Sequence, residues 1–112
     1  MVFDMGVLLG RLDGDVTLAR EFLTLFMANV PESVDSMREA VRLKNYKLLR
    51  MNAHSIKSSA RLFGAHDLAE ASQLLEQAAA KADEGRVAEL LANFLTVLDK
   101  FGVLLNEQGY LA

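Results

Sequence analysis

The residues best suited to do chemistry are a histidine and two cations that follow it. Lys57 comes three residues after His54, and Arg61 comes seven residues after it. A helix turns by about 100° per residue, so residues at these spacings share one side of it. We therefore expect Lys57 and Arg61 to lean toward the face that carries His54. An exposed imidazole with cations beside it suits a nucleophile that carries an anionic group.

The apolar residues around His54 predict that it lies away from the core. They follow the spacing of a buried helix face: Leu49, Ala53, Ile56, Ala60 and Phe63. At about 100° per residue, His54 lies roughly 140° from the direction of Leu49. The sequence therefore predicts a solvent-exposed histidine in the middle of a helix that runs from Tyr46 to Phe63.

Other chemistries of His54 find little support in the sequence. The second histidine, His66, is twelve residues away, no carboxylate lies three or four residues from His54, and there is no cysteine. No metal-ligand cluster is therefore predicted. No acid near in sequence can orient the ring, although one from another helix could do so. Glycine-rich nucleotide-binding patterns are absent. The alternative to a functional His54 is a surface histidine without a role.

Charge is spread unevenly along the chain. The net charge of −3 argues against a general nucleic-acid binder. Between residues 40 and 65 there is no Asp or Glu, whereas six of the twelve cations fall there. These cations are Arg42, Lys44, Lys47, Arg50, Lys57 and Arg61. The rest of the chain is acidic, so the positive field is confined to the region around His54. Such a field would steer an acidic partner to this helix, and we expect Arg50 to belong to the docking face.

Length and composition suggest the kind of protein. A chain of 112 residues corresponds to one ordinary domain, and the absence of cysteine excludes disulfides. No apolar run approaches the roughly 18 residues that span a bilayer. The first six residues lack the basic region and cleavage site of a signal peptide. We expect a cytoplasmic protein, or the cytoplasmic part of a membrane-bound one.

Helical periodicity and turn signals predict an all-α chain. The expected helices are Val2–Leu9, Asp15–Asn29, Pro31–Leu43, Tyr46–Phe63, Asp67–Ala82 and Arg86–Leu105, with turns at residues 11–14, 44–45 and 83–85. Leu18, Phe22, Leu25 and Phe26 are expected to point inward. Pro31 is expected to end or kink its helix. Asn45 is expected to cap the start of the His54 helix, and Gly64 is expected to cap its end.

Short loops between helices of similar length predict an antiparallel, up-and-down four-helix bundle with an additional short N-terminal helix. We expect a single domain over residues 1–112, with a core from about residue 4 to residue 105. The tail from residue 106 to residue 112 is expected to fray.

The chain resembles the histidine-containing phosphotransfer (HPt) domain family over roughly residues 4–105. That family has His-x-x-Lys-Gly-x-x, then Gly-Ala, then an apolar-Glu pair on the next helix. The corresponding segments here are His54-Ser55-Ile56-Lys57-Ser58-Ser59-Ala60, Phe63-Gly64-Ala65 and Leu75-Glu76, with Phe22-Leu23-x-x-Phe26 and Pro31 upstream. One departure is Ser58, where the family usually has glycine. Serine is still small, so a partner should still reach the histidine.

The resemblance implies a phosphocarrier that works in a multistep His–Asp phosphorelay and is not an enzyme by itself. His54 would carry the phosphoryl group on Nε2 and exchange it with the phosphoaspartate of a receiver domain. That receiver would belong to a response regulator or to a hybrid sensor histidine kinase. Side chains of the following helix can bond near the histidine ring in this family, and Gln73 or Glu76 could do so here.

The remaining assignments concern charge, partners and metals. Lys57 would stabilise the phosphoryl charge, and Ser58, Arg61 and Arg50 would form the docking face. The chain has no acidic cluster near His54, so the Mg²⁺ needed for transfer would sit on the receiver and the chain itself would bind no cofactor or metal. We expect a monomer.

Two alternative functions stay open. The chain could be the phosphorylated-histidine domain of a chemotaxis-type histidine kinase, whose phosphoryl donor would be a kinase catalytic domain. It could also be a helical adaptor that carries no phosphate. The His54 and Lys57 pair argues against the adaptor, because an adaptor needs neither residue.

Overall fold

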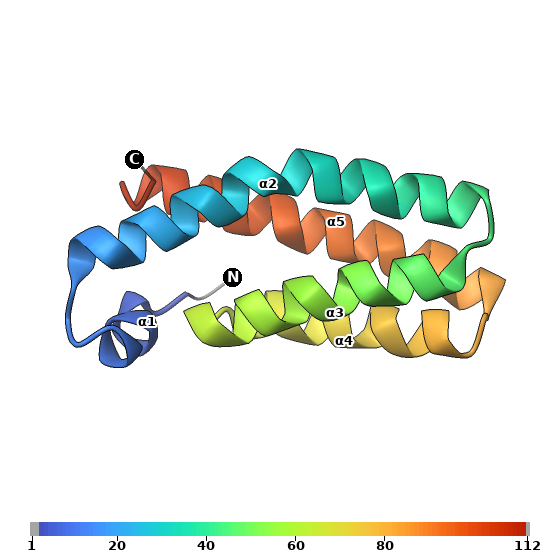
Figure 1. Ribbon diagram of the computed structural model, residues 1–112, viewed down its shortest axis with the longest axis horizontal. Helices are drawn as coiled ribbons and strands as arrows, with labels where there is room; N and C mark the ends of the chain where they lie inside the picture. The colour runs from blue at the N-terminus through green and yellow to red at the C-terminus, as the bar shows by residue number, and fades with distance from the viewer. Residues whose placement is uncertain (1–2, 112) are drawn as a thin grey trace.

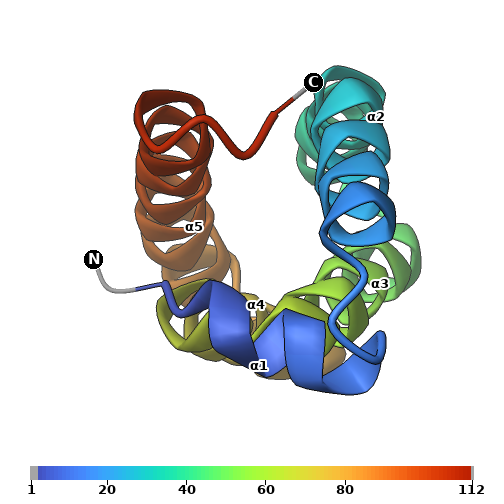
Figure 2. The same ribbon diagram turned by 90° about the vertical axis from the view of Figure 1, so that its left-hand side faces the viewer.

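Residues 3–111 are described by the computed structural model, and they fold into five helices without a strand among them (Figure 1). The helices are α1 (Met5–Arg11), α2 (Val16–Arg42), α3 (Tyr46–Phe63), α4 (His66–Ala80) and α5 (Glu84–Glu107). The four long helices alternate in direction, and α1 lies at one end of them (Figures 1 and 2). The predicted all-α, antiparallel bundle with a short extra helix is confirmed. None of these helices is both long and apolar enough to cross a membrane.

Side-chain caps explain where the His54 helix begins and ends. The Asn45 side chain accepts a hydrogen bond from the backbone N–H of Leu48, which satisfies one of the free donors at the start of α3. Gly64 ends α3 with a φ of 73°, in the left-handed region that favours glycine. A Cβ at Gly64 would also lie 2.6 Å from Cγ1 of Val7, so glycine lets α1 approach the end of α3. Both predicted caps are confirmed.

The prediction that Pro31 separates two helices is wrong, because α2 continues unbroken through Pro31. Pro31 lies on the exposed side of the helix, where water can replace the one lost backbone bond. Leu23 before it and Met37 after it are both fully buried on the core side. Packing on both sides of the proline therefore holds one helix together.

Other helix bounds also differ from the prediction. Asp4 caps α1, which begins at Met5; Val2 lies outside the described residues. Ala82 has a φ of 52° in the loop after α4, so that helix stops before the predicted Ala82. Asp83 is the N-cap of α5, and its side chain accepts from the N–H of Arg86. The predicted turn at residues 83–85 is therefore wrong, because Glu84 and Gly85 already belong to α5.

An aromatic cluster holds the α1 end of the bundle together. The ring of Phe26 lies 5.2 Å from that of Phe63 and 6.2 Å from that of Phe101, so it joins α2 to α3 and α5. Phe3 packs edge-on against Phe101 and against Tyr110, which follows α5. The chain after α5 thus returns to the core near the first described residue. The fraying of the tail stays a prediction.

The inward orientation predicted for two residues of α2 is wrong. Leu25 is 61% exposed and Phe22 is 37% exposed, whereas Ala19 and Leu23 are fully buried. The segment from residue 22 to residue 26 holds more apolar side chains than one helix face can bury. Because α2 packs mainly on α3 and only sparsely on α5, it turns Ala19 and Leu23 inward and leaves Leu25 in solvent.

Candidate functional site

His54 stands on the outer face of α3, near its middle. Its side chain is 64% exposed, whereas Ala53, Ile56 and Ala60 of the same helix are buried. The predicted exposure of the imidazole is confirmed. The helix is fixed beneath the ring by its caps and by its packing along α4, so the ring is presented from a rigid element.

A carboxylate from the next helix holds the imidazole. Oε2 of Glu76, on α4, lies 2.6 Å from Nδ1 of His54. A carboxylate can only accept hydrogen bonds, so Nδ1 carries the proton and donates it. In the neutral ring Nε2 then keeps its lone pair. Glu76 bonds to Nδ1, so this carboxylate does not engage the Nε2 lone pair. The geometry therefore selects Nε2 as the nucleophilic atom.

The same carboxylate also binds Lys57. Nζ of Lys57 lies 2.7 Å from Oε1 of Glu76, so the two oxygens of one carboxylate bridge the two α3 residues. Burial by itself raises the pKa of Glu76. The hydrogen bonds and charges of Lys57 and His54 outweigh that effect and hold the pKa below its ordinary value of 4.5. Glu76 is thus a charged acceptor at neutral pH.

The position expected for Lys57 on the outer face is wrong. Its side chain is only 10% exposed and its amino group is turned toward α4. Three residues after His54 correspond to a rotation about 60° short of a full turn, which points the side chain to the α4 side of the histidine. Glu76 is there to receive it. Although α3 contains no Asp or Glu of its own, the carboxylate of Glu76 on α4 therefore lies beside it.

The other predicted residues lie around this centre with different partners. Gln73 accepts a hydrogen bond from Nη2 of Arg61 at 2.9 Å, so it is Glu76 that contacts the histidine ring. The hydroxyl of Ser58 donates to the carbonyl of His54 at 3.1 Å. Arg50 is exposed and lines a hollow between α3 and α4 together with Met51, His54, Glu76, Gln77 and Ala80.

The site shows no arrangement for holding a metal. Within residues 3–111 no group of three or more His, Cys, Asp or Glu side chains gathers closely enough to bind an ion. The arrangement can instead do nucleophilic chemistry. An exposed imidazole nitrogen faces solvent, an ionised carboxylate fixes the opposite nitrogen, and a buried lysine fixes the carboxylate.

A bundle that presents an oriented histidine from the middle of one helix is the arrangement of a histidine phosphotransfer module. The sequence model of the Hpt domain matches residues 21–101, which is most of the chain. The chain therefore belongs to the Hpt domain family, and the resemblance found in the sequence is confirmed. It is a histidine phosphotransfer module of phosphorelays, and members of this family interact with receiver domains. Searches of curated proteins and of solved structures gave no significant match.

Proposed function

We propose that His54 accepts a phosphoryl group on Nε2 from the phosphoaspartate of a receiver domain and passes it to another receiver. The hydrogen bond between Nδ1 and Glu76 carries this proposal, because it leaves the Nε2 lone pair available toward solvent. The chain acts as a phosphocarrier and has no kinase activity of its own. Mg²⁺ stays with the receiver, since this chain offers no acidic cluster beside Nε2 within the described residues.

In the transfer step, one bond to phosphorus forms and another breaks. The Nε2 lone pair attacks phosphorus, the bond from phosphorus to the aspartyl oxygen breaks, and the aspartate leaves as a carboxylate. The imidazole gains positive charge as the new P–N bond forms. The carboxylate of Glu76, 2.6 Å from Nδ1, stabilises that charge and holds the ring in the reactive tautomer.

Lys57 supports this step through Glu76. Its amino group lies 2.7 Å from Oε1, so it keeps the carboxylate ionised and aimed at Nδ1. The role first expected, in which Lys57 offsets the phosphoryl charge, stays a prediction. Arg61 and Arg50 are exposed near His54 and supply cationic contacts for the acidic site of a receiver.

Transfer of label from a receiver tests the proposal. A receiver domain carrying a radiolabelled phosphoaspartate is incubated with the chain and Mg²⁺. We expect acid-labile, base-stable label on the chain, which is absent in His54→Gln and kept in His66→Gln, the variant of the other histidine. Binding of receivers without any transfer would leave the adaptor as the function. Label that arrives only from a kinase catalytic domain would favour the chemotaxis-type alternative.

A further inference from the structure

The hollow between α3 and α4 holds His54 together with one permanent cation. We refer to it as the α3/α4 hollow, and its lining residues are Arg50, Met51, His54, Glu76, Gln77 and Ala80. Apart from the imidazole itself, Arg50 is the only basic side chain among the described residues that line it. An anion added to the imidazole would therefore meet the positive charge of Arg50 in this hollow.

The other cations close to His54 already have partners. The amino group of Lys57 is turned toward α4, where it is bound to a carboxylate, and its side chain is only 10% exposed. Arg61 donates to Gln73 and lies seven residues after His54, about 10 Å along the helix. Arg50 is exposed, and its side chain forms no hydrogen bond or ion pair within the part of the chain that the structure describes. Its guanidinium is therefore available to a new partner.

Helix geometry brings the imidazole close to Arg50. Side chains on an α-helix tilt toward its N-terminus, so a residue covers the turn that precedes it. Arg50 comes four residues before His54, and residues at this spacing have Cβ atoms about 5–6 Å apart. Both side chains line the same hollow. A long arginine side chain at this distance can reach a group attached to the ring.

A phosphoryl group on His54 would need a cation beside it. Such a group brings about −1.5 to −2 charges near neutral pH. Nε2 is separated from Nδ1 by a single ring carbon, and Nδ1 lies 2.6 Å from the carboxylate of Glu76, so the new charge enters next to an existing one. Lys57 balances Glu76, to which it is bound. The charge of the phosphoryl group itself must therefore be balanced by another residue.

We propose that the guanidinium of Arg50 binds the phosphoryl oxygens of phosphorylated His54 in the α3/α4 hollow and so stabilises the phosphorylated state of the chain. This inference rests on the proposed function, because it requires His54 to carry the group on Nε2. Two N–H donors of one guanidinium can bind two oxygens of one phosphoryl group, whereas a lysine acts as a point charge. Arg50 then has a role after transfer that is separate from a contact with the receiver.

The equilibrium of phosphoryl exchange separates this role from docking. An equilibrium shifts only through an interaction that differs between its two states. A residue that merely helps two proteins dock changes the rate of exchange, whereas a residue that binds the phosphoryl group also changes the final ratio of phosphorylated chain to phosphorylated receiver. We measure that ratio for the wild type, Arg50→Gln and Arg50→Lys with one receiver, at concentrations where the proteins are mostly free. Lys47→Gln is the matched control, because it removes the same charge from an exposed position of α3 outside the hollow.

We expect Arg50→Gln to shift the ratio about fivefold toward the receiver, the upper range for an exposed ion pair. Arg50→Lys should retain part of the wild-type value, and Lys47→Gln should leave the ratio unchanged. An unchanged ratio in Arg50→Gln would overturn the inference even if transfer is slower, because that result indicates a docking contact. An equal shift in Lys47→Gln would overturn it too, since the effect would then come from the general field of α3.

Nitrogen NMR of the arginine side chains gives a second readout that needs no receiver. Phosphoramidate, a small phosphoryl donor, labels His54 directly. The guanidinium resonance of Arg50, identified by its absence in Arg50→Gln, should move on labelling, whereas that of Arg38, an exposed arginine of α2, should not. An Arg50 resonance that stays in place would overturn the inference and leave the proposed function intact. If phosphoramidate labels the chain but no receiver exchanges with it, the proposed function itself fails, whatever the Arg50 resonance shows.

Discussion

The replacement of Glu76 by glutamine tests how the histidine is oriented. Lys57 can only donate hydrogen bonds, so in Glu76→Gln it takes the amide oxygen as its acceptor. The amide NH₂ group must then face Nδ1 of His54, where the carboxylate oxygen Oε2 now accepts. An NH₂ group donates to Nδ1 and so places the ring proton on Nε2. The variant therefore inverts the tautomer and occupies the nucleophilic lone pair.

The expected size of the effect follows from the bond that is lost. A hydrogen bond to a charged group contributes about 1.5–3 kcal/mol. If all of it acts in the transition state, transfer slows by about 10- to 150-fold. The control is Glu70→Gln, which removes the same charge from an exposed position of the same helix. It should transfer at the wild-type rate.

The assay combines a rate with a spectroscopic signature. Single-turnover transfer from a saturating labelled receiver gives the rate of the chemical step. Nitrogen NMR of the histidine side chains reports which ring nitrogen is protonated, and it should show the proton on Nδ1 in the wild type and on Nε2 in Glu76→Gln. A variant that transfers at the wild-type rate, or that keeps its proton on Nδ1, would refute the reasoning.

Three further predictions concern the same contacts and the fold. Lys57→Ala should slow transfer and leave the helical circular dichroism spectrum unchanged; a wild-type transfer rate would remove the role of Lys57. Because the folded pKa of Glu76 is lowered, its contribution to the free energy of unfolding should be present above pH 4.5 and disappear as the pH falls through the folded pKa. Denaturant titrations across that range should show a steeper loss of stability in the wild type than in Glu76→Gln, and equal slopes would contradict the lowered pKa. Gly64→Ala should lower the free energy of unfolding by about 2–4 kcal/mol, since it adds backbone strain and a clash with Val7. Gly14→Ala has a similar φ of 76° but no atom within 4 Å of the added Cβ, so its cost should be only about 1 kcal/mol; equal costs would show that the contact with α1 contributes nothing.

The sequence determined the features that depend on neighbours along the chain. The cap at Asn45 and the left-handed end at Gly64 are local, because each involves residues within one helical turn. The exposure of His54 follows from the phase of the apolar residues around it in one helix. The family was also readable, since its motif lies within a few turns of α3 and α4.

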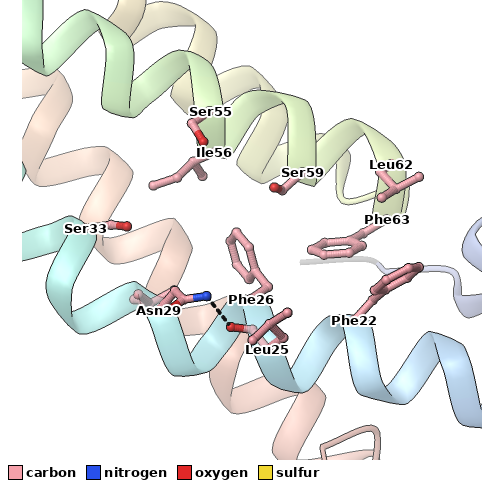
Figure 3. A pocket seen from close by; sticks show the side chains of 11 residues that line it. Phe22, Leu25, Phe26, Asn29, Ser33, Ser55, Ile56, Ser59, Leu62 and Phe63 are labelled. Atoms are coloured by element: carbon pink, nitrogen blue, oxygen red, sulfur yellow. Dashed lines mark hydrogen bonds between the residues drawn. The ribbon is translucent and has the colours of Figure 1, made fainter.

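Predictions that rest only on neighbours along the chain were wrong where tertiary packing acts against the local preference. Pro31 is a strong signal for a helix end, yet the buried residues before and after it keep α2 continuous. The segment around Phe22 and Leu25 has several apolar residues in a row, so its periodicity does not select the buried face. That choice depends on how α2 packs against α3, which leaves Leu25 in solvent beside a pocket between the two helices (Figure 3).

Only the tertiary structure decided how the site is assembled. Glu76 is 22 residues from His54 and 19 from Lys57, so their contacts depend on the rotation and offset of α4 against α3. The sequence left Gln73 and Glu76 as equal candidates for the ring, since both lie on the same helix. In the structure Gln73 bonds to Arg61, whereas Glu76 bonds to His54. The Lys57 side chain, expected on the surface, is instead buried against α4. Helix phase could place the imidazole in water, but a contact between helices was needed to fix which nitrogen carries the proton.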